Sequence, residues 1–320
     1  MEGSISGRQA GAWGFCAVSV PAVLTCAGLG WGWVLLGCAI AVGYYVLTQE
    51  LAGGAVYLPE LTVRAFGKAA GRVVLAIGGV FTLLTAAQTA RRAGIAFPDG
   101  TAELAGGVIV LLGTLAGEKG AKQAAKVCGV LFLVLAGLYT IIILAAAKNV
   151  QLRWMAPWGG ARQTLEVVPS LLALTCLRGR KAAVKSGWLG LLAVCPAAFA
   201  ALTAGCLSPR LTQQLTFPFY TVSQSLSVLG VMERLEPIVS AALFMGFFAL
   251  ESLLLEAGRE QIERAAPIIA GKRWARAALG IAVFGLSFLT DGIPAEVWAL
   301  GAAVCWGIAP LLTQLIVAIK

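Results

Sequence analysis

The feature that most constrains this sequence is a succession of long, nearly uninterrupted apolar runs joined by short polar connectors. Hydrophobic residues make up 59% of the 320 residues and charged residues only 12%, and the mean hydropathy is +0.87. Soluble domains carry about 25% charged residues, because most of their surface faces water. The chain is therefore predicted to be an integral membrane protein. Disordered, collagen-like and disulfide-scaffold proteins are excluded by the same composition.

The apolar runs are continuous and do not alternate with polar residues, which favours membrane-spanning helices over the strands of a barrel. A helix needs about 20 apolar residues to cross the hydrocarbon core. We predict an all-α fold, a single membrane domain over residues 1–320, with ten spans: 11–29, 31–47, 73–90, 104–117, 127–147, 165–177, 187–207, 238–255, 277–290 and 297–319. The runs 104–117, 165–177 and 277–290 are short, so they are either extended by flanking polar residues or partly broken.

The distribution of basic residues supports this count through the positive-inside rule. With both termini in the cytoplasm, 17 of the 24 Lys and Arg residues fall in cytoplasmic segments. The seven in outer segments are Arg91, Arg92, Lys148, Arg153, Arg162, Arg210 and Arg234. The net charge of +9 thus follows membrane topology, and no nucleic-acid partner is expected. No cleavable signal peptide is expected either, because the first ten residues are polar.

Two connectors are long enough to hold structure of their own. The cytoplasmic connector 51–71 contains Pro59 and a glycine–lysine run, and a short interfacial helix is expected there. The outer connector 209–237 has four apolar residues at helical spacing, which are Phe219, Val222, Leu226 and Leu229. The predicted helix either lies on the outer membrane surface or packs over the bundle.

Catalytic and metal-binding residues are scarce in this chain. It has no histidine, and its eight cysteines occur singly, without a CxxC pair. Zinc sites and histidine-based triads are therefore excluded, and the cysteines are interpreted as small hydrophobic residues in helix packing. No phosphate-binding glycine loop, nucleophile elbow, HExxH motif or paired carboxylates occur. The chain is not expected to be an enzyme or to hold a cofactor.

Ionisable groups inside a span are costly and are functional candidates by default. Glu251 lies within the predicted span 238–255. It is a proton or cation relay, a salt-bridge partner or a neutral hydrogen-bonded acid, unless it snorkels to the interface. Glu103 and Glu166 stand at the starts of short spans, where a carboxylate suits the positive end of the helix dipole.

The third span carries a polar stripe at helical spacing. Thr82, Thr85 and Thr89 share one face, and Gln88 lies beside them. Such a stripe either forms hydrogen bonds with a neighbouring helix or lines a cavity.

Proline occurs in the first span of each half of the chain. Pro21 lies within 11–29 and Pro169 within 165–177, and each frees a backbone carbonyl and bends its helix. Interrupted helices at corresponding places in two halves mark a midplane substrate site in inverted-repeat transporters, and an ordinary kink is the alternative. We predict a ligand site here, formed by Ser19, Pro21, Thr25, Thr85, Pro169, Ser170 and Phe247.

Three segments match the pattern of one known family in the family's order. The first is 58–61 (Leu-Pro-Glu-Leu) followed by Phe-Gly-Lys at 66–68 and by Gly71. The second is 155–160 (Met-Ala-Pro-Trp-Gly-Gly). The third and most specific is Phe217-Pro218 followed by 230–236 (Gly-Val-Met-Glu-Arg-Leu-Glu). Together they resemble the permease-like B subunit of bacterial spore germinant receptors, the GerAB type, in the amino acid–polyamine–organocation superfamily.

This resemblance implies a LeuT-type five-plus-five inverted repeat, with repeat one over about 11–147 and repeat two over about 161–319. It implies a nutrient-sensing subunit in the inner membrane of the spore, working with a membrane-anchored A-type subunit and a lipoprotein C-type subunit. A small amino acid would bind at the broken first and sixth helices and shift the conformational population. Glu233, Arg234 and Glu236 lie beyond the apolar run and are expected to face these partners.

Two other functions remain open on the sequence alone. One is a secondary active amino-acid transporter coupled to protons or sodium, with Glu251 as the coupling residue. Flanking A- and C-type genes would favour the receptor, and an isolated gene would favour the transporter. The other is a degenerate paralogue that only supports its partners, which the short sixth span favours.

Overall fold

The computed structural model describes residues 5–26, 30–51, 58–96, 101–118, 120–155, 157–158, 172–173, 184, 186–212, 214–215, 217–225, 236–290 and 292–319. Within these ranges the regular structure is helical, and no strand occurs. The first half contains α1 (Gly7–Cys26), α2 (Trp31–Leu51), α3 (Leu58–Ile95), α4 (Ala102–Glu118), α5 (Ala121–Ala146) and η1 (Leu152–Trp154). The second contains α7 (Ser186–Leu207), α8 (Pro209–Thr212), α9 (Pro218–Ser225), α10 (Glu236–Ala265), η4 (Pro267–Ile269), α11 (Arg273–Ser287), α12 (Ala295–Ala302), η5 (Ala303–Ile308) and α13 (Ala309–Ile319).

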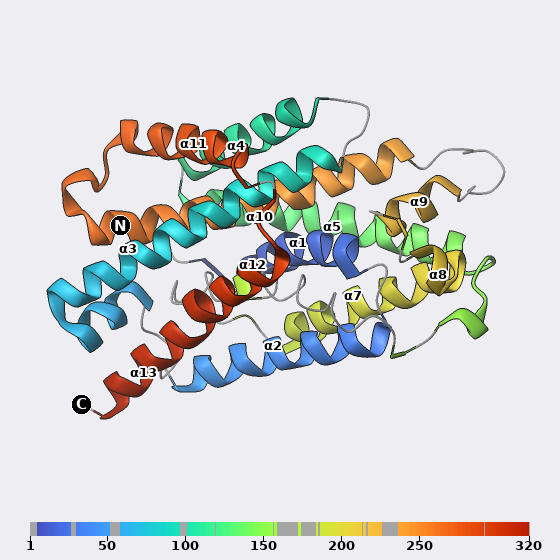
Figure 1. The fold of residues 1–320 in the computed structure, drawn as a ribbon, viewed down its shortest axis with the longest axis horizontal. Coiled ribbons are helices and arrows are strands. Elements are labelled where there is room, and N and C mark those ends of the chain that lie inside the picture. The colour runs from blue at the N-terminus through green and yellow to red at the C-terminus, as the bar shows by residue number, and fades with distance from the viewer. Residues whose placement is uncertain are drawn as a thin grey trace.

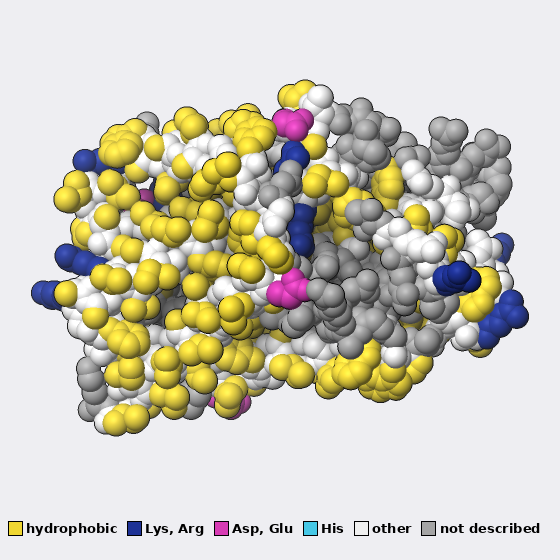
Figure 2. Space-filling view, in the orientation of Figure 1, with side chains coloured by type: hydrophobic (Ala, Val, Ile, Leu, Met, Phe, Trp, Pro, Cys, Tyr) yellow, Lys and Arg dark blue, Asp and Glu magenta, His cyan; other side chains and the backbone are white. Residues whose placement is uncertain are grey.

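Six of the described helical segments are long and apolar enough to cross a membrane, which agrees with the predicted class of helical membrane protein. They are Trp31–Thr48, Pro59–Ile95, Ala121–Ala146, Gly187–Leu207, Val239–Ala265 and Glu296–Ile319. Two shorter apolar helices accompany them, Ala102–Gly117 and Trp274–Ser287. On the face in Figure 2, apolar side chains cover much of the surface. Large apolar residues such as Ile40, Leu133 and Ile281 are more than half exposed, as expected of side chains that face lipid.

The helices form a bundle around α1 and the antiparallel pair α3 and α10 (Figure 1). Helix α1 packs against α5, α7 and α10, and α4 and α11 pack together beside α3. Helix α2 contacts α7 and α13 on the other side. Five exposed basic residues lie where α3 begins and α10 ends, which we call the basic end of the bundle: Arg64, Lys68, Arg72, Arg264 and Lys272.

Helix α1 is buried on nearly all sides, because glycines let its neighbours approach closely. A Cβ atom placed on Gly246 of α10 would lie 2.2 Å from Cγ2 of Val20. A Cβ atom placed on Gly11 of α1 would lie 2.4 Å from the Trp188 ring on α7. The packing of α1 therefore depends on these two positions having no side chain.

Several helix predictions are confirmed and one is wrong. The short run 104–117 is extended by flanking residues at both ends into α4. The run 277–290 is extended at its start only, because α11 begins at Arg273 and ends at Ser287. The prediction of an interrupted first span is wrong, because α1 continues through Pro21 to Cys26. A proline removes one hydrogen bond, and contacts with neighbouring helices can hold a membrane helix together around it. Of the predicted span 165–177, only residues 172 and 173 lie among the described residues.

The two connectors also contain helices. In the connector 51–71, α3 begins at Leu58 and changes direction at Gly67, whose φ of 81° is accessible to glycine. In the connector 209–237, α9 buries Phe219 and Val222 against the bundle, which favours the packed alternative over a helix on the membrane surface. Leu226 and Leu229 lie outside the described residues.

The last predicted span, 297–319, is helical throughout but contains a π-helical turn, η5. The hydroxyl of Tyr44 on α2 donates to the backbone carbonyl of Gly307. The Trp306 indole Nε1–H donates to Thr82 Oγ1 on α3 at 3.2 Å. Single π-turns inside helices occur often at functional sites, and this one directs Trp306 toward α3.

Candidate ligand-binding site

A small, partly open cavity lies between α1, α3, α10 and η5. Its volume is about 30 Å³, room for about two water molecules. Its lining contains three of the seven predicted ligand-binding residues: Pro21, Thr85 and Phe247. The other lining residues are Gln88, Thr89, Arg92, Ala173, Leu250, Leu254 and Trp306.

The polar wall of the cavity comes from one face of α3. Thr85, Gln88, Thr89 and Arg92 follow one another at helical spacing and all line the cavity. The Thr85 hydroxyl donates to the Phe81 carbonyl at 3.0 Å, and the Thr89 hydroxyl donates to the Thr85 carbonyl at 2.8 Å. A hydroxyl that already donates still has lone pairs. These two side chains are therefore suited to accept hydrogen bonds from a ligand cation.

Both alternatives for the threonine stripe hold, each for different residues. Thr85 and Thr89 line the cavity. Thr82 instead accepts the indole hydrogen bond of Trp306, so it joins α3 to the last helix. The stripe thus serves interhelical bonding at one end and the cavity at the other.

Arg92 brings a positive charge to the cavity, whereas its neighbour Arg91 does not. Arg91 forms an ion pair of 3.2 Å with Glu103, which lies in the first turn of α4, as predicted from the helix dipole. Arg92 is partly buried and lines the cavity. A guanidinium at this position can bind a carboxylate by charge-assisted hydrogen bonds.

The opposite walls are apolar and deeply buried. Phe247, Leu250 and Leu254 of α10 are all at least 96% buried, and Trp306 is 2% exposed. The Trp306 ring packs edge-on against Phe81, with 5.2 Å between the ring centroids. An aromatic face beside a polar wall suits a small ligand that carries a cationic group.

The other predicted site residues are not brought to this cavity by the described structure. Ser19 is fully buried on the side of α1 facing α5, where the Tyr139 hydroxyl lies 3.4 Å from its Oγ. Thr25 lies in α1, but its side chain is outside the described set, as is that of Glu236 at the start of α10. The remaining candidates lie outside the described residues: Glu166, Pro169, Ser170, Glu233 and Arg234.

Glu251 is fully buried on α10, beside the cavity wall. Neither of its carboxyl oxygens has a hydrogen-bond partner within the described part of the chain. Its Cγ would lie 3.2 Å from a Cβ atom placed on Gly113, so the side chain is directed toward α4. The alternative that it snorkels to the interface is therefore wrong. Burial without a partner favours the neutral carboxyl, because an isolated buried charge is costly.

Five lining residues were not singled out by the sequence analysis: Arg92, Ala173, Leu250, Leu254 and Trp306. Arg92 lies seven residues after Thr85, two helical turns further along the same face, and this spacing was an available signal. Trp306 had no such signal, because its position depends on the π-turn and on packing between distant helices.

Comparison with known proteins does not assign a function to this cavity. No protein-family model matches the chain. No curated protein matches it either.

Proposed function

We propose that this chain is the permease-like subunit of a spore germinant receptor and binds a small amino acid in the cavity between α1, α3 and α10. The observation that carries the proposal is the meeting of Pro21, Thr85 and Phe247 at one cavity. The three segments that resemble the GerAB type supply the family. In this proposal the ten spans form a LeuT-type inverted repeat with both termini in the cytoplasm, and Glu233, Arg234 and Glu236 face the A- and C-type subunits.

The cavity lining favours a zwitterion over a neutral ligand. Arg92 would hold the carboxylate. The ammonium would donate to Thr85 and Thr89, whose hydroxyls retain acceptor lone pairs. Phe247 and Trp306 would limit the size of the ligand side chain and exclude water from the polar contacts.

The small volume of the cavity links binding to signalling. An amino acid has more atoms than the roughly two water molecules that this cavity admits, so the lining helices would move apart when it binds. A ligand that binds only the expanded form shifts the population toward that form. The partner subunits would respond to this shift, with no covalent chemistry.

Arg92→Gln is expected to weaken alanine binding about tenfold to a hundredfold, the range for one charge-assisted hydrogen bond. Binding is measured with tritiated alanine, glycine and valine on the full-length protein in liposomes. Arg91→Gln is the matched control, because Arg91 pairs with the half-exposed Glu103. It should keep binding within about twofold, since exposed ion pairs contribute little. If Arg92→Gln and Arg91→Gln weakened alanine binding equally, the cavity would not be the binding site.

Glu251 favours a second candidate, a secondary amino-acid transporter driven by protons. A buried carboxyl without a hydrogen-bond partner can change its protonation state as the helices around it move. In liposomes with an imposed pH gradient, a transporter would accumulate tritiated alanine. Glu251→Gln would then abolish the accumulation and leave equilibrium binding unchanged. A receptor would bind alanine in both proteins and accumulate it in neither.

A further inference from the structure

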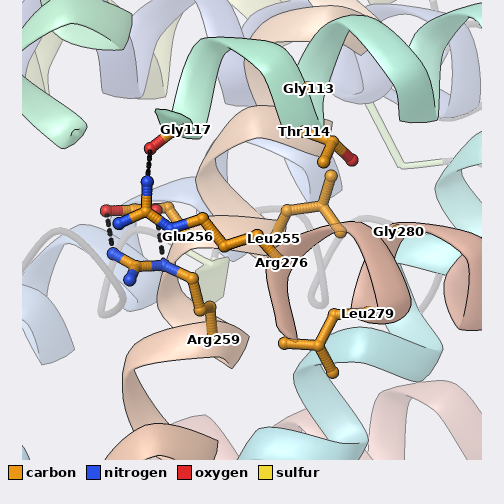
Figure 3. A pocket seen from close by; sticks show the side chains of 9 residues that line it. All are labelled: Gly113, Thr114, Gly117, Leu255, Glu256, Arg259, Arg276, Leu279 and Gly280. Atoms are coloured by element: carbon orange, nitrogen blue, oxygen red, sulfur yellow. Dashed lines mark hydrogen bonds and ion pairs between the residues drawn. The ribbon is translucent and has the colours of Figure 1, made fainter. Parts of the chain in front are cut away.

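A buried cluster of charged groups ties α4, α10 and α11 together, close to the basic end of the bundle (Figure 3). Arg259 binds Glu256 through two hydrogen bonds, Nη2 to Oε1 at 2.8 Å and Nε to Oε2 at 3.1 Å. Its Nη1 donates to Glu263 at 2.9 Å. The side chains of Arg259 and Glu256 are only 8% and 3% exposed, so this cluster lies inside the protein.

Arg276 of α11 closes the cluster onto α4. Its Nη1 donates to the backbone carbonyl of Gly117 at 3.0 Å, and Figure 3 shows its guanidinium beside the Glu256 carboxylate. A Cβ atom on Gly117 would lie 3.3 Å from Oε2 of Glu256. The glycine therefore lets the carboxylate and the guanidinium both approach the end of α4.

A small cavity lies directly behind this cluster. Its volume is about 20 Å³, room for about one water molecule. Besides the charged residues and Gly117, it is lined by Gly113, Thr114, Leu255, Leu279 and Gly280. The Thr114 hydroxyl donates to the Val110 carbonyl at 2.8 Å, so its remaining lone pairs can accept a hydrogen bond from water.

Gly113 connects this cavity to Glu251. It lines the cavity, and it is also the residue of α4 that the Glu251 side chain packs against. Phe247, Leu250 and Leu254 line the ligand cavity from α10, and Glu251 lies next to them on the same helix. On its α4 side, a polar route from Glu251 leads past Gly113 and Thr114 to the charged cluster.

We propose that Glu251 exchanges its proton with solution at the basic end through this cavity, and that the Arg276–Gly117 contact is the gate. This inference rests on the proposal that Glu251 carries a proton. While the gate is closed, the Arg276 side chain and the paired side chains of Arg259 and Glu256 line the cavity and block the path of water. The carboxylates of Glu256 and Glu263 offset the two positive charges, so the barrier to hydronium is steric. When Arg276 releases the Gly117 carbonyl, water enters, and one proton moves between this water and the Glu251 carboxyl.

The test follows the carboxyl proton itself. Full-length protein in phosphatidylethanolamine–phosphatidylglycerol liposomes is transferred to D₂O, and infrared spectroscopy follows the C=O stretch of protonated carboxyls. The band that is missing from the spectrum of Glu251→Gln belongs to Glu251. The speed with which this band shifts after transfer to D₂O gives the rate of proton exchange. Arg276→Ala is expected to exchange about tenfold faster or more, because it loses one charge-assisted hydrogen bond. Arg276→Lys, which keeps the charge and a donor, should exchange near the wild-type rate.

Two further variants separate the gate from general loosening of the fold. Leu279→Phe fills the cavity and is expected to slow exchange, whereas any unfolding would speed it. Lys272→Ala removes an exposed charge at the same end and should leave the rate unchanged. If the Glu251 band exchanged at the same rate in the wild type, Arg276→Ala and Leu279→Phe, the proposed route would be wrong. Glu251 would still be shown to carry a proton. Spectra of wild type and Glu251→Gln with the same bands would instead overturn the proposal that Glu251 carries a proton.

Discussion

Gly246→Leu is expected to remove most of the folded protein from the membrane. Even a Cβ atom at this position would lie 2.2 Å from Cγ2 of Val20 and 2.4 Å from its Cβ. Val20 cannot move aside, because it is fully buried in α1, which is held between α5, α7 and α10. Overpacking of a rigid core costs about 3 kcal/mol or more when neither backbone can shift. Membrane helices rely on such small residues for close packing.

The measurement for this prediction is the amount of monodisperse protein after mild detergent extraction, followed by its thermal unfolding. Gly43→Leu on α2 is the matched control, because no atom lies within 4 Å of a Cβ placed there. The control should be extracted at the wild-type level and unfold at the wild-type temperature. If Gly246→Leu behaved like Gly43→Leu, α1 and α10 would not approach each other as closely as described.

The positions of the helices were largely predictable, because the length of an apolar run determines what can cross the hydrocarbon core. The predicted run 187–207 differs from α7 (Ser186–Leu207) by one residue. The ends of α3 and α10 were not predictable in this way. Helix α10 continues ten residues beyond the predicted end at 255, to Ala265. Arg259 pairs with both Glu256 and Glu263 along this extension. Hydropathy detects the apolar part of a helix and not the paired charges that extend it.

The candidate site was partly predictable for a related reason. A polar stripe on an apolar helix predicts which face of α3 bonds a neighbour or lines a cavity, and part of this face does line the cavity. Ser19 was assigned to the same site as Pro21. Residues two positions apart in a helix point about 200° apart around its axis, and Ser19 therefore faces α5 instead. Trp306 entered the site through packing between segments more than 200 residues apart, which no local pattern encodes.

Arg259→Met is expected to destabilise the protein by about 3–5 kcal/mol, the cost of leaving a buried charge without its partner. Arg259 is the common partner of Glu256 and Glu263. Its loss therefore removes the positive charge that balances these two carboxylates. Methionine keeps much of the apolar contact of the arginine stem, and the effect therefore reports on charge. Unfolding of the purified protein in mixed micelles, titrated with a denaturing detergent, gives the change in free energy of unfolding.

Two comparisons make this prediction specific. Arg264→Met on the same helix removes a pair with Glu60, 3.2 Å long, in which both side chains are nearly half exposed. Such surface pairs contribute about 0–1 kcal/mol, so this variant should unfold close to the wild type. The double variant Glu256→Met/Arg259→Met should be more stable than Arg259→Met alone, because it also removes one carboxylate that the single variant leaves buried. Equal stabilities of the single and double variants would mean that Glu256 is compensated without Arg259, and the cluster would then depend on Arg276 as its main cation.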